Sequence, residues 1–153
     1  MTKSILVVCM GNICRSPLAE GILHKKLDAA GLDISVDSAG TGSWHVGDAP
    51  DARAVVAARL KGYDITGIRA RALQRDDFAT FDLILAMDQE NIRDLENLRP
   101  AGNATPVRLI TEFGADDRPQ EVTDPYYTGK FNHVIETLEA SIEGLIDQLR
   151  ARQ

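Results

Sequence analysis

The 153-residue sequence has few cysteines, few aromatic residues and no long apolar segment. Its two cysteines lie close together in the chain, so they do not form the disulfide framework that is typical of small secreted proteins. No apolar run approaches the roughly 18 residues of a membrane-spanning helix, and no secretory signal pattern precedes the first apolar segment. These absences predict a cytoplasmic protein that does not bind membranes.

Positive charge is also scarce, since 17 lysines and arginines stand against 23 aspartates and glutamates, for a net charge of −6. An acidic chain favours neither nucleic acid nor an anionic membrane as a partner. The three histidines, His24, His45 and His133, show no metal-ligand spacing, and we expect them to be solvated surface residues. We therefore expect no metal site, and any anion must be bound by local groups.

Short apolar runs alternate with segments of helical periodicity along the chain. The mainly apolar runs 4–8, 82–87 and 107–110 and the alternating run 34–38 predict four strands, and apolar residues recur at helical spacing after each of them. In the helix that follows Pro50, we expect an inward face made of Ala52, Val55, Val56 and Leu60. The alternation predicts one α/β domain over residues 1–153, with a parallel sheet covered by helices on both faces.

Directly after the first predicted strand comes the loop Cys9-Met10-Gly11-Asn12-Ile13-Cys14-Arg15-Ser16, and we expect it to be an N-terminal phosphate-binding loop. Ser16 and Pro17 are typical of a helix start, with Ser16 as the cap and Pro17 at the first helical position. Successive backbone N–H groups at the positive end of a helix dipole favour a tetrahedral oxyanion. Ligands of parallel sheets bind beyond the carboxyl ends of the strands, which is where Cys9 lies.

Each residue type in this loop has a chemical use. The surroundings favour the thiolate of Cys9, which is the nucleophilic form of cysteine, and Arg15 offers a planar fork for two phosphate oxygens. Gly11 is expected to supply a backbone turn with positive φ and a close approach to the ligand. Asn12 tolerates a left-handed conformation and can hold the loop through its side chain. The Ser16 hydroxyl could donate to Cys9.

The string Cys-x-Gly-Asn-x-Cys-Arg-Ser-Pro in this strand-to-helix context resembles the loop of the low-molecular-weight protein tyrosine phosphatases. The resemblance implies a sheet order 2-1-3-4 and hydrolysis of phosphotyrosine through a cysteinyl phosphate, with inorganic phosphate as product and no cofactor. It suggests phosphotyrosine proteins as partners, a cognate tyrosine kinase among them. The residues that would bind phosphate or support the loop are Met10, Gly11, Asn12, Ile13, Cys14, Ser16 and Ser38.

Asp124-Pro125-Tyr126-Tyr127 resembles the general-acid loop of the same family. Taken alone, these four residues would more often form an ordinary turn. The resemblance implies that Asp124 protonates the leaving phenol and then activates the water that hydrolyses the cysteinyl phosphate. Tyr126 and Tyr127, with Trp44 across from them, could wall a deep slot for a phenyl ring, in which phosphoserine would be too short to reach Cys9. The alternative for both Trp44 and Tyr127 is a surface residue without contact to substrate.

Two positions leave further questions open. The resemblance implies a reversible disulfide between Cys14 and Cys9, whereas Cys14 could instead be a small buried side chain that supports the loop. The family commonly brings a histidine to the hydrogen bonds around the loop, and Ile68 occupies that position here. We therefore expect these hydrogen bonds to run without a histidine, among Asn12, Ser16 and Ser38.

Four other functions share parts of this pattern. Arsenate reductases of this fold need further cysteines, which the chain lacks. Protein arginine phosphatases carry threonine where this chain has Ile13, and an apolar side chain suits a phenyl ring better than a guanidinium. Phosphocarrier domains have no use for Arg15 together with Asp124. A phosphotyrosine-binding module without activity would be expected to have lost Cys9 or Asp124, and both are present.

Overall fold

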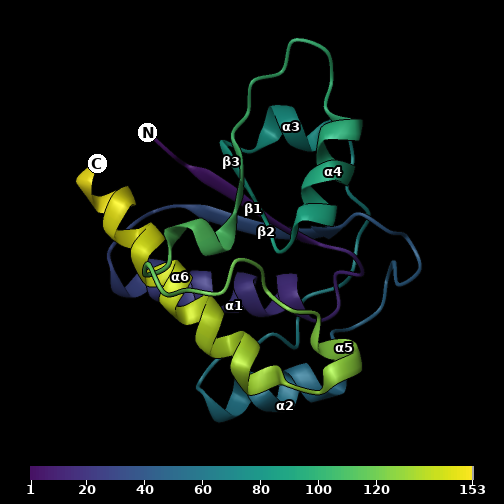
Figure 1. Cartoon of the computed structure of the whole chain (residues 1–153), viewed down its shortest axis with the longest axis vertical. Coiled ribbons are helices and arrows are strands. Elements are labelled where there is room, and N and C mark those ends of the chain that lie inside the picture. Colours follow the sequence, from purple (N-terminus) through teal and green to yellow (C-terminus); the bar gives the residue numbers. More distant parts are fainter. Residues whose placement is uncertain (153) are drawn as a thin grey trace.

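A computed structural model describes residues 1–152 and contains a four-stranded parallel sheet in the order β2-β1-β3-β4 (Figure 1). The strands are β1 (Ser4–Cys9), β2 (Ser35–Gly40), β3 (Leu83–Ala86) and β4 (Val107–Leu109). β1 pairs with β2 from Ser4↔Ser35 to Cys9↔Gly40, and with β3 from Ile5↔Leu83 to Val8↔Ala86. The predicted α/β class, the parallel sheet and its strand order are confirmed.

Helices cover both faces of the sheet, which is why β1 is apolar and buried from Ile5 to Val8 instead of alternating. Ile5 and Val7 face one buried cluster, to which α1 (Arg15–Ala29) and α6 (Phe131–Ala151) contribute. Leu6 and Val8 face a second cluster with α3 (Asp77–Thr80) and α4 (Gln89–Leu98). In Figure 1, α3 and α4 lie above the strands and α1, α2 and α6 below them. The remaining helices are α2 (Ala52–Leu60), the 3-10 turn η1 (Ile110–Phe113) and α5 (Pro125–Thr128).

The start of α1 differs from the expected one. The helix begins at Arg15 with Cys14 as N-cap, and no side chain caps it. Ser16 lies inside the first turn, where its hydroxyl contacts Cys9 and Asn12 instead of the free backbone N–H groups. The prediction of Ser16 as cap and Pro17 as first helical residue is therefore wrong: the Ser16 hydroxyl forms hydrogen bonds within the loop, and Pro17 is the third residue of the helix.

The inward face of α2 was also predicted wrongly. Val56 and Leu60 are 54% and 80% exposed, and the buried residues of the helix are Ala54, Ala57 and Ala58. Ala52 is exposed and Val55 only half-buried. These alanines recur at helical spacing and let α2 pack close to the core, which leaves the larger apolar side chains on the outside. The helix begins at Ala52, after Asp51 as N-cap.

The topology brings three parts of the chain together at the carboxyl ends of the strands. Cys9 ends β1, and Asp88 follows β3, the neighbouring parallel strand. The Val122 backbone N–H donates to the Met87 carbonyl (2.9 Å), which brings the segment before α5 to the same end of the sheet. Over residues 1–152, no helix combines the length and the apolar character needed to cross a membrane.

Candidate active site

The loop from Cys9 to Ser16 folds back on itself through a left-handed residue. Asn12 has φ 56° and is the only residue other than glycine with positive φ between positions 1 and 152. Gly11 was expected to supply that conformation and does not. Its lack of a side chain serves packing instead, since a Cβ atom there would lie 3.2 Å from Cδ2 of His45. Asparagine can adopt this conformation because its short polar side chain forms local hydrogen bonds.

Two donors face the sulfur of Cys9, which is almost fully buried. The Asn12 backbone N–H donates to Sγ (3.2 Å), and the Ser16 Oγ lies 3.0 Å from Sγ. The Asn12 side-chain amide donates to the same Ser16 oxygen (2.8 Å), so the single hydrogen of this hydroxyl is left to point at the sulfur. The Cys9 sulfur is therefore an acceptor for two hydrogen-bond donors of its own loop.

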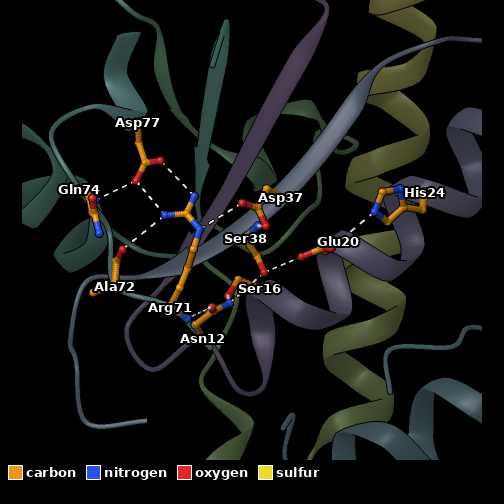
Figure 2. A network of polar contacts seen from close by, with 10 residues as sticks. All are labelled: Asn12, Ser16, Glu20, His24, Asp37, Ser38, Arg71, Ala72, Gln74 and Asp77. Carbon is orange, nitrogen blue, oxygen red and sulfur yellow. Dashed lines mark hydrogen bonds and ion pairs between the residues drawn. The ribbon is translucent and has the colours of Figure 1, made fainter. Parts of the chain in front are cut away.

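Behind the loop runs a chain of polar contacts that Figure 2 shows in full. The Asn12 amide also donates to the Ser38 Oγ (3.0 Å), and the Ser38 hydroxyl donates to Glu20 (2.6 Å). The Arg71 backbone N–H donates to the Asn12 side-chain oxygen (3.0 Å). The expected contacts among Asn12, Ser16 and Ser38 are thus present without a histidine from position 68, where Ile68 packs against the core. Glu20 and Arg71 were not foreseen.

The outer part of this network pairs one arginine with two aspartates. The Arg71 guanidinium donates to Asp37 (3.0 Å) and to both oxygens of Asp77 (3.1 and 3.0 Å). Burial raises the pKa of Glu20 and the charge of Asp37 adds to this, whereas the Ser38 hydroxyl and His24 act against it. His24 was expected to be a solvated surface residue; it is half exposed, but its Nε2 lies 3.5 Å from Glu20.

Arg15 lies 3% exposed at the start of α1, with its guanidinium held on three sides. Nη1 donates to Oδ2 of Asp88 (2.7 Å) and to the Val122 carbonyl (3.0 Å), and Nη2 lies 3.7 Å from Oδ2 of Asp124. Burial alone would lower the pKa of Arg15, but Cys9, Asp88 and Asp124 together raise it. The guanidinium therefore stays charged, in a fixed orientation beside Cys9.

Asp124 caps the short helix α5, in which Pro125 takes the first position. Its Oδ1 accepts a hydrogen bond from the Tyr126 backbone N–H (3.0 Å), which leaves Oδ2 for the cavity and for Arg15. The sequence Asp-Pro favours this arrangement, since aspartate is a good cap and proline a good first helical residue.

A cavity of about 380 Å³ brings most of the predicted site residues together. Its lining consists of Cys9, Met10, Gly11, Ile13, Cys14, Arg15, Trp44, His45, Asp124, Tyr126 and Tyr127. Asn12, Ser16 and Ser38 are buried and do not line it; they support the loop from behind. His45 was expected to be solvated and in fact lines the cavity, as its position next to Trp44 could have suggested. His133 is exposed, as expected.

Three aromatic side chains stand at the mouth of this cavity. Trp44, Tyr126 and Tyr127 are 75%, 44% and 81% exposed although all three line it, and the two tyrosine rings meet edge to face at 5.1 Å. The Trp44 ring packs against Gly42, where a Cβ atom would overlap the indole. Large apolar side chains left open to solvent at a cavity mouth are available to an aromatic ligand.

Cys14 lies in the cavity wall as a free thiol, as Cys9 does. Burial, and after it the charge of Asp51, raises the pKa of Cys14 to about 12. Of the two cysteines, only Cys9 has hydrogen-bond donors aimed at its sulfur. The two cysteines of this loop therefore differ because different residues surround each sulfur.

Comparisons with known proteins agree with this geometry. A model of the low molecular weight phosphotyrosine protein phosphatase family matches residues 4–153. A Synechocystis protein, provisionally named a low molecular weight protein-tyrosine-phosphatase, is 46% identical over 150 residues, with 95% of each chain covered. The crystal structure of YfkJ from Bacillus subtilis superposes with a TM-score of 0.92 at 35% identity, covering 100% of this chain and 98% of YfkJ. A Drosophila arginine phosphatase superposes with a TM-score of 0.90 at 32% identity, with 98% of each chain covered.

The chain belongs to the low molecular weight phosphotyrosine protein phosphatase family, whose fold and phosphoric monoester hydrolase activity it shares.

Proposed function

We propose that the chain, acting as one phosphatase domain over residues 1–153, hydrolyses phosphotyrosine in proteins with Cys9 as nucleophile. One observation carries the proposal: the Cys9 sulfur contacts the Ser16 hydroxyl and the Asn12 N–H, and Cys9 lines the same cavity as Arg15 and Asp124. Arg15 and the loop amides bind the phosphate dianion, and the Cys9 thiolate attacks phosphorus in line. Positioning and electrostatic stabilisation of the equatorial oxygens supply most of the rate.

Asp124 is proposed to act twice. It protonates the phenolic oxygen as the P–O bond breaks, and its carboxylate then takes a proton from the water that attacks the cysteinyl phosphate. This second step releases inorganic phosphate and restores the Cys9 thiolate. A general acid contributes roughly 10²–10⁴ in rate, so Asp124→Asn should lower kcat/KM by a factor in that range.

Phosphotyrosine is favoured over other phosphoamino acids because the cavity wall is aromatic and apolar. Trp44, Tyr126, Tyr127 and Ile13 all line it, and together they suit a phenyl ring better than a guanidinium. The natural partners would be phosphotyrosine proteins, with a cognate tyrosine kinase among them. The two free thiols fit a reducing compartment such as the cytoplasm.

Release of phosphate from phosphotyrosine, phosphoserine and phosphoarginine peptides, measured in parallel, tests this assignment. Cys9→Ser serves as the blank. Release from phosphotyrosine alone is the expected result. A preference for phosphoarginine would show that the aromatic wall and Ile13 had been misinterpreted while the chemistry of the loop stood. A rate equal to the Cys9→Ser blank on all three peptides would refute the enzyme itself.

We also propose that Cys14 protects Cys9 by forming a reversible disulfide with it under mild oxidation. Wild type inactivated by dilute peroxide should recover after treatment with a thiol reductant. Cys14→Ser should recover much less, because its sulfenic acid oxidises further. Equal recovery of the two proteins would reject this role and leave Cys14 as a small buried side chain that supports the loop.

A further inference from the structure

The helix α5, between Asp124 and Gly129, has little polar attachment to the rest of the fold. It has only four residues, and both of its ends are closed by local hydrogen bonds. Between residues 1 and 152, the only hydrogen bond from α5 to a different helix or strand joins the Tyr126 carbonyl oxygen to Nη2 of Arg53 on α2 (3.2 Å). Arg53 is therefore the polar link between α2 and the segment that presents Asp124.

The guanidinium of Arg53 is fixed from the opposite side as well. Asp51 accepts hydrogen bonds from its Nε (3.1 Å) and from Nη2 (2.9 Å), the nitrogen that also donates to Tyr126. The ring centres of Tyr126 and Phe131 lie 5.4 and 4.9 Å from its Cζ, within the range of cation–π attraction. Since Phe131 is the first residue of α6, the guanidinium of Arg53 contacts both α5 and the helix that follows it.

Asp51 connects this arrangement to the phosphate-binding loop. Its backbone N–H donates to the Ile13 carbonyl (2.9 Å), and its carboxylate caps α2. The hydrogen bonds from Arg53 lower the pKa of Asp51, so the ion pair persists in mildly acidic solution. A continuous path of contacts therefore runs from Ile13 through Asp51 and Arg53 to Tyr126.

We propose that Arg53 is a positioning residue for the general acid: it holds α5 against the phosphate-binding loop and so fixes Asp124 relative to Cys9. The inference rests on the proposed role of Asp124. Arg53 does not line the cavity, so it acts through Asp124 and Tyr126 rather than on the phosphate. Its loss should be felt most in the step in which the phenol departs, because that step needs the Asp124 proton at a defined distance.

The test compares kcat/KM for phenyl phosphate and 4-nitrophenyl phosphate. Phenolate leaves slowly unless it is protonated, whereas 4-nitrophenolate leaves readily without a proton. Arg53→Gln should lower kcat/KM about 10-fold for phenyl phosphate and less than about 3-fold for 4-nitrophenyl phosphate, a partial loss of general-acid catalysis. Arg53→Lys should resemble Arg53→Gln, because an ammonium group cannot hold Asp51 and Tyr126 together as the planar fork does.

Arg59→Gln is the matched control, since Arg59 is an exposed arginine of the same helix and lines a different cavity, to which α5 contributes no residue. It should behave as wild type. An equal loss on both substrates in Arg53→Gln, or full activity in Arg53→Lys, would overturn the inference. Asp124→Asn, measured beside them, separates the two levels of the argument. If Asp124→Asn loses far more kcat/KM on phenyl phosphate than on 4-nitrophenyl phosphate and Arg53→Gln does not, only the role of Arg53 is refuted. If Asp124→Asn loses the same factor on both substrates, the role of Asp124 as general acid is refuted too.

Discussion

Asp88 uses its two carboxylate oxygens for two separate functions, and the variant Asp88→Asn separates them. Oδ2 accepts a hydrogen bond from Nη1 of Arg15 (2.7 Å), and Oδ1 accepts one from the Asn91 backbone N–H (2.8 Å) and so caps α4. Asparagine caps helices about as well as aspartate does. The variant therefore keeps the cap and loses the charged partner of Arg15.

The magnitude follows from the burial of this pair. A hydrogen bond to a charged group is worth about 1.5–3 kcal/mol, and screening by water is small because the side chains of Arg15 and Asp88 are 4% and 22% exposed. Asparagine can still offer an amide oxygen to Arg15. The variant should therefore lose about 1.5–2 kcal/mol of the interaction energy that orients the guanidinium. At about 1.4 kcal/mol for each factor of ten, kcat/KM for a phosphotyrosine peptide should fall about 10- to 30-fold.

Steady-state kinetics and urea denaturation of Asp88→Asn and Asp88→Ala check this reasoning. Asp88→Ala loses the cap in addition, so it should be about 1 kcal/mol less stable than Asp88→Asn while its kcat/KM is similarly reduced. A kcat/KM for Asp88→Asn within twofold of wild type would refute the claim that Asp88 orients Arg15. Equal stability of the two variants would refute the cap.

Three further predictions concern the loop, the second cysteine and the tryptophan. Asn12→Gly keeps the left-handed backbone and loses the side-chain hydrogen bonds, so urea denaturation should show a loss of about 1–3 kcal/mol, and Asn12→Ala should lose roughly 1 kcal/mol more from backbone strain; equal losses would contradict the strain. The pKa of Cys14 is raised to about 12 in the folded chain, so the unfolded chain ionises first as pH rises. The stability that this thiol confers is complete below about pH 9 and is lost between pH 9 and about 12; Cys14→Ser should flatten that decline, and an unchanged decline would exclude Cys14 as its source. Gly42→Ala displaces the Trp44 ring and should raise KM for a phosphotyrosine peptide several-fold without changing inhibition by inorganic phosphate; weaker phosphate inhibition would place the damage in the loop instead.

The parts of the fold that could be predicted are those governed by neighbours in the sequence. Residues 5–8 are all apolar, and this indicates a strand with both faces buried, which β1 is at these positions. Asp88 could be assigned as the cap of α4 because the free N–H groups of a helix start lie within reach of that side chain. The sequence 124–127 was expected, taken alone, to form an ordinary turn, whereas Asp124 and Pro125 in fact begin the short helix α5.

The contacts of Arg15 with Asp88 and Val122, and that of Asn12 with Arg71, could not be predicted, because these partners come from distant parts of the chain. Asp88 and Val122 reach Arg15 only after β1 and β3 pair, and Arg71 meets Asn12 only when its segment crosses the sheet edge. The face of α2 was mistaken for a related reason. Periodicity finds an apolar stripe, but the distance between α2 and the core decides whether alanines or larger side chains fill it.

The central claim is that the phosphoryl group is transferred to the sulfur of Cys9 before it is transferred to water. Trapping this cysteinyl phosphate tests the claim most directly. The enzyme is mixed with excess phosphotyrosine peptide and quenched in acid within milliseconds, and its peptides are then analysed by mass spectrometry. The account predicts one phosphoryl group on the enzyme fragment that contains Cys9, formed as fast as the dephosphorylated substrate peptide appears and absent from Cys9→Ser. Appearance of the dephosphorylated substrate peptide with no phosphoryl group on that fragment at any time would contradict it.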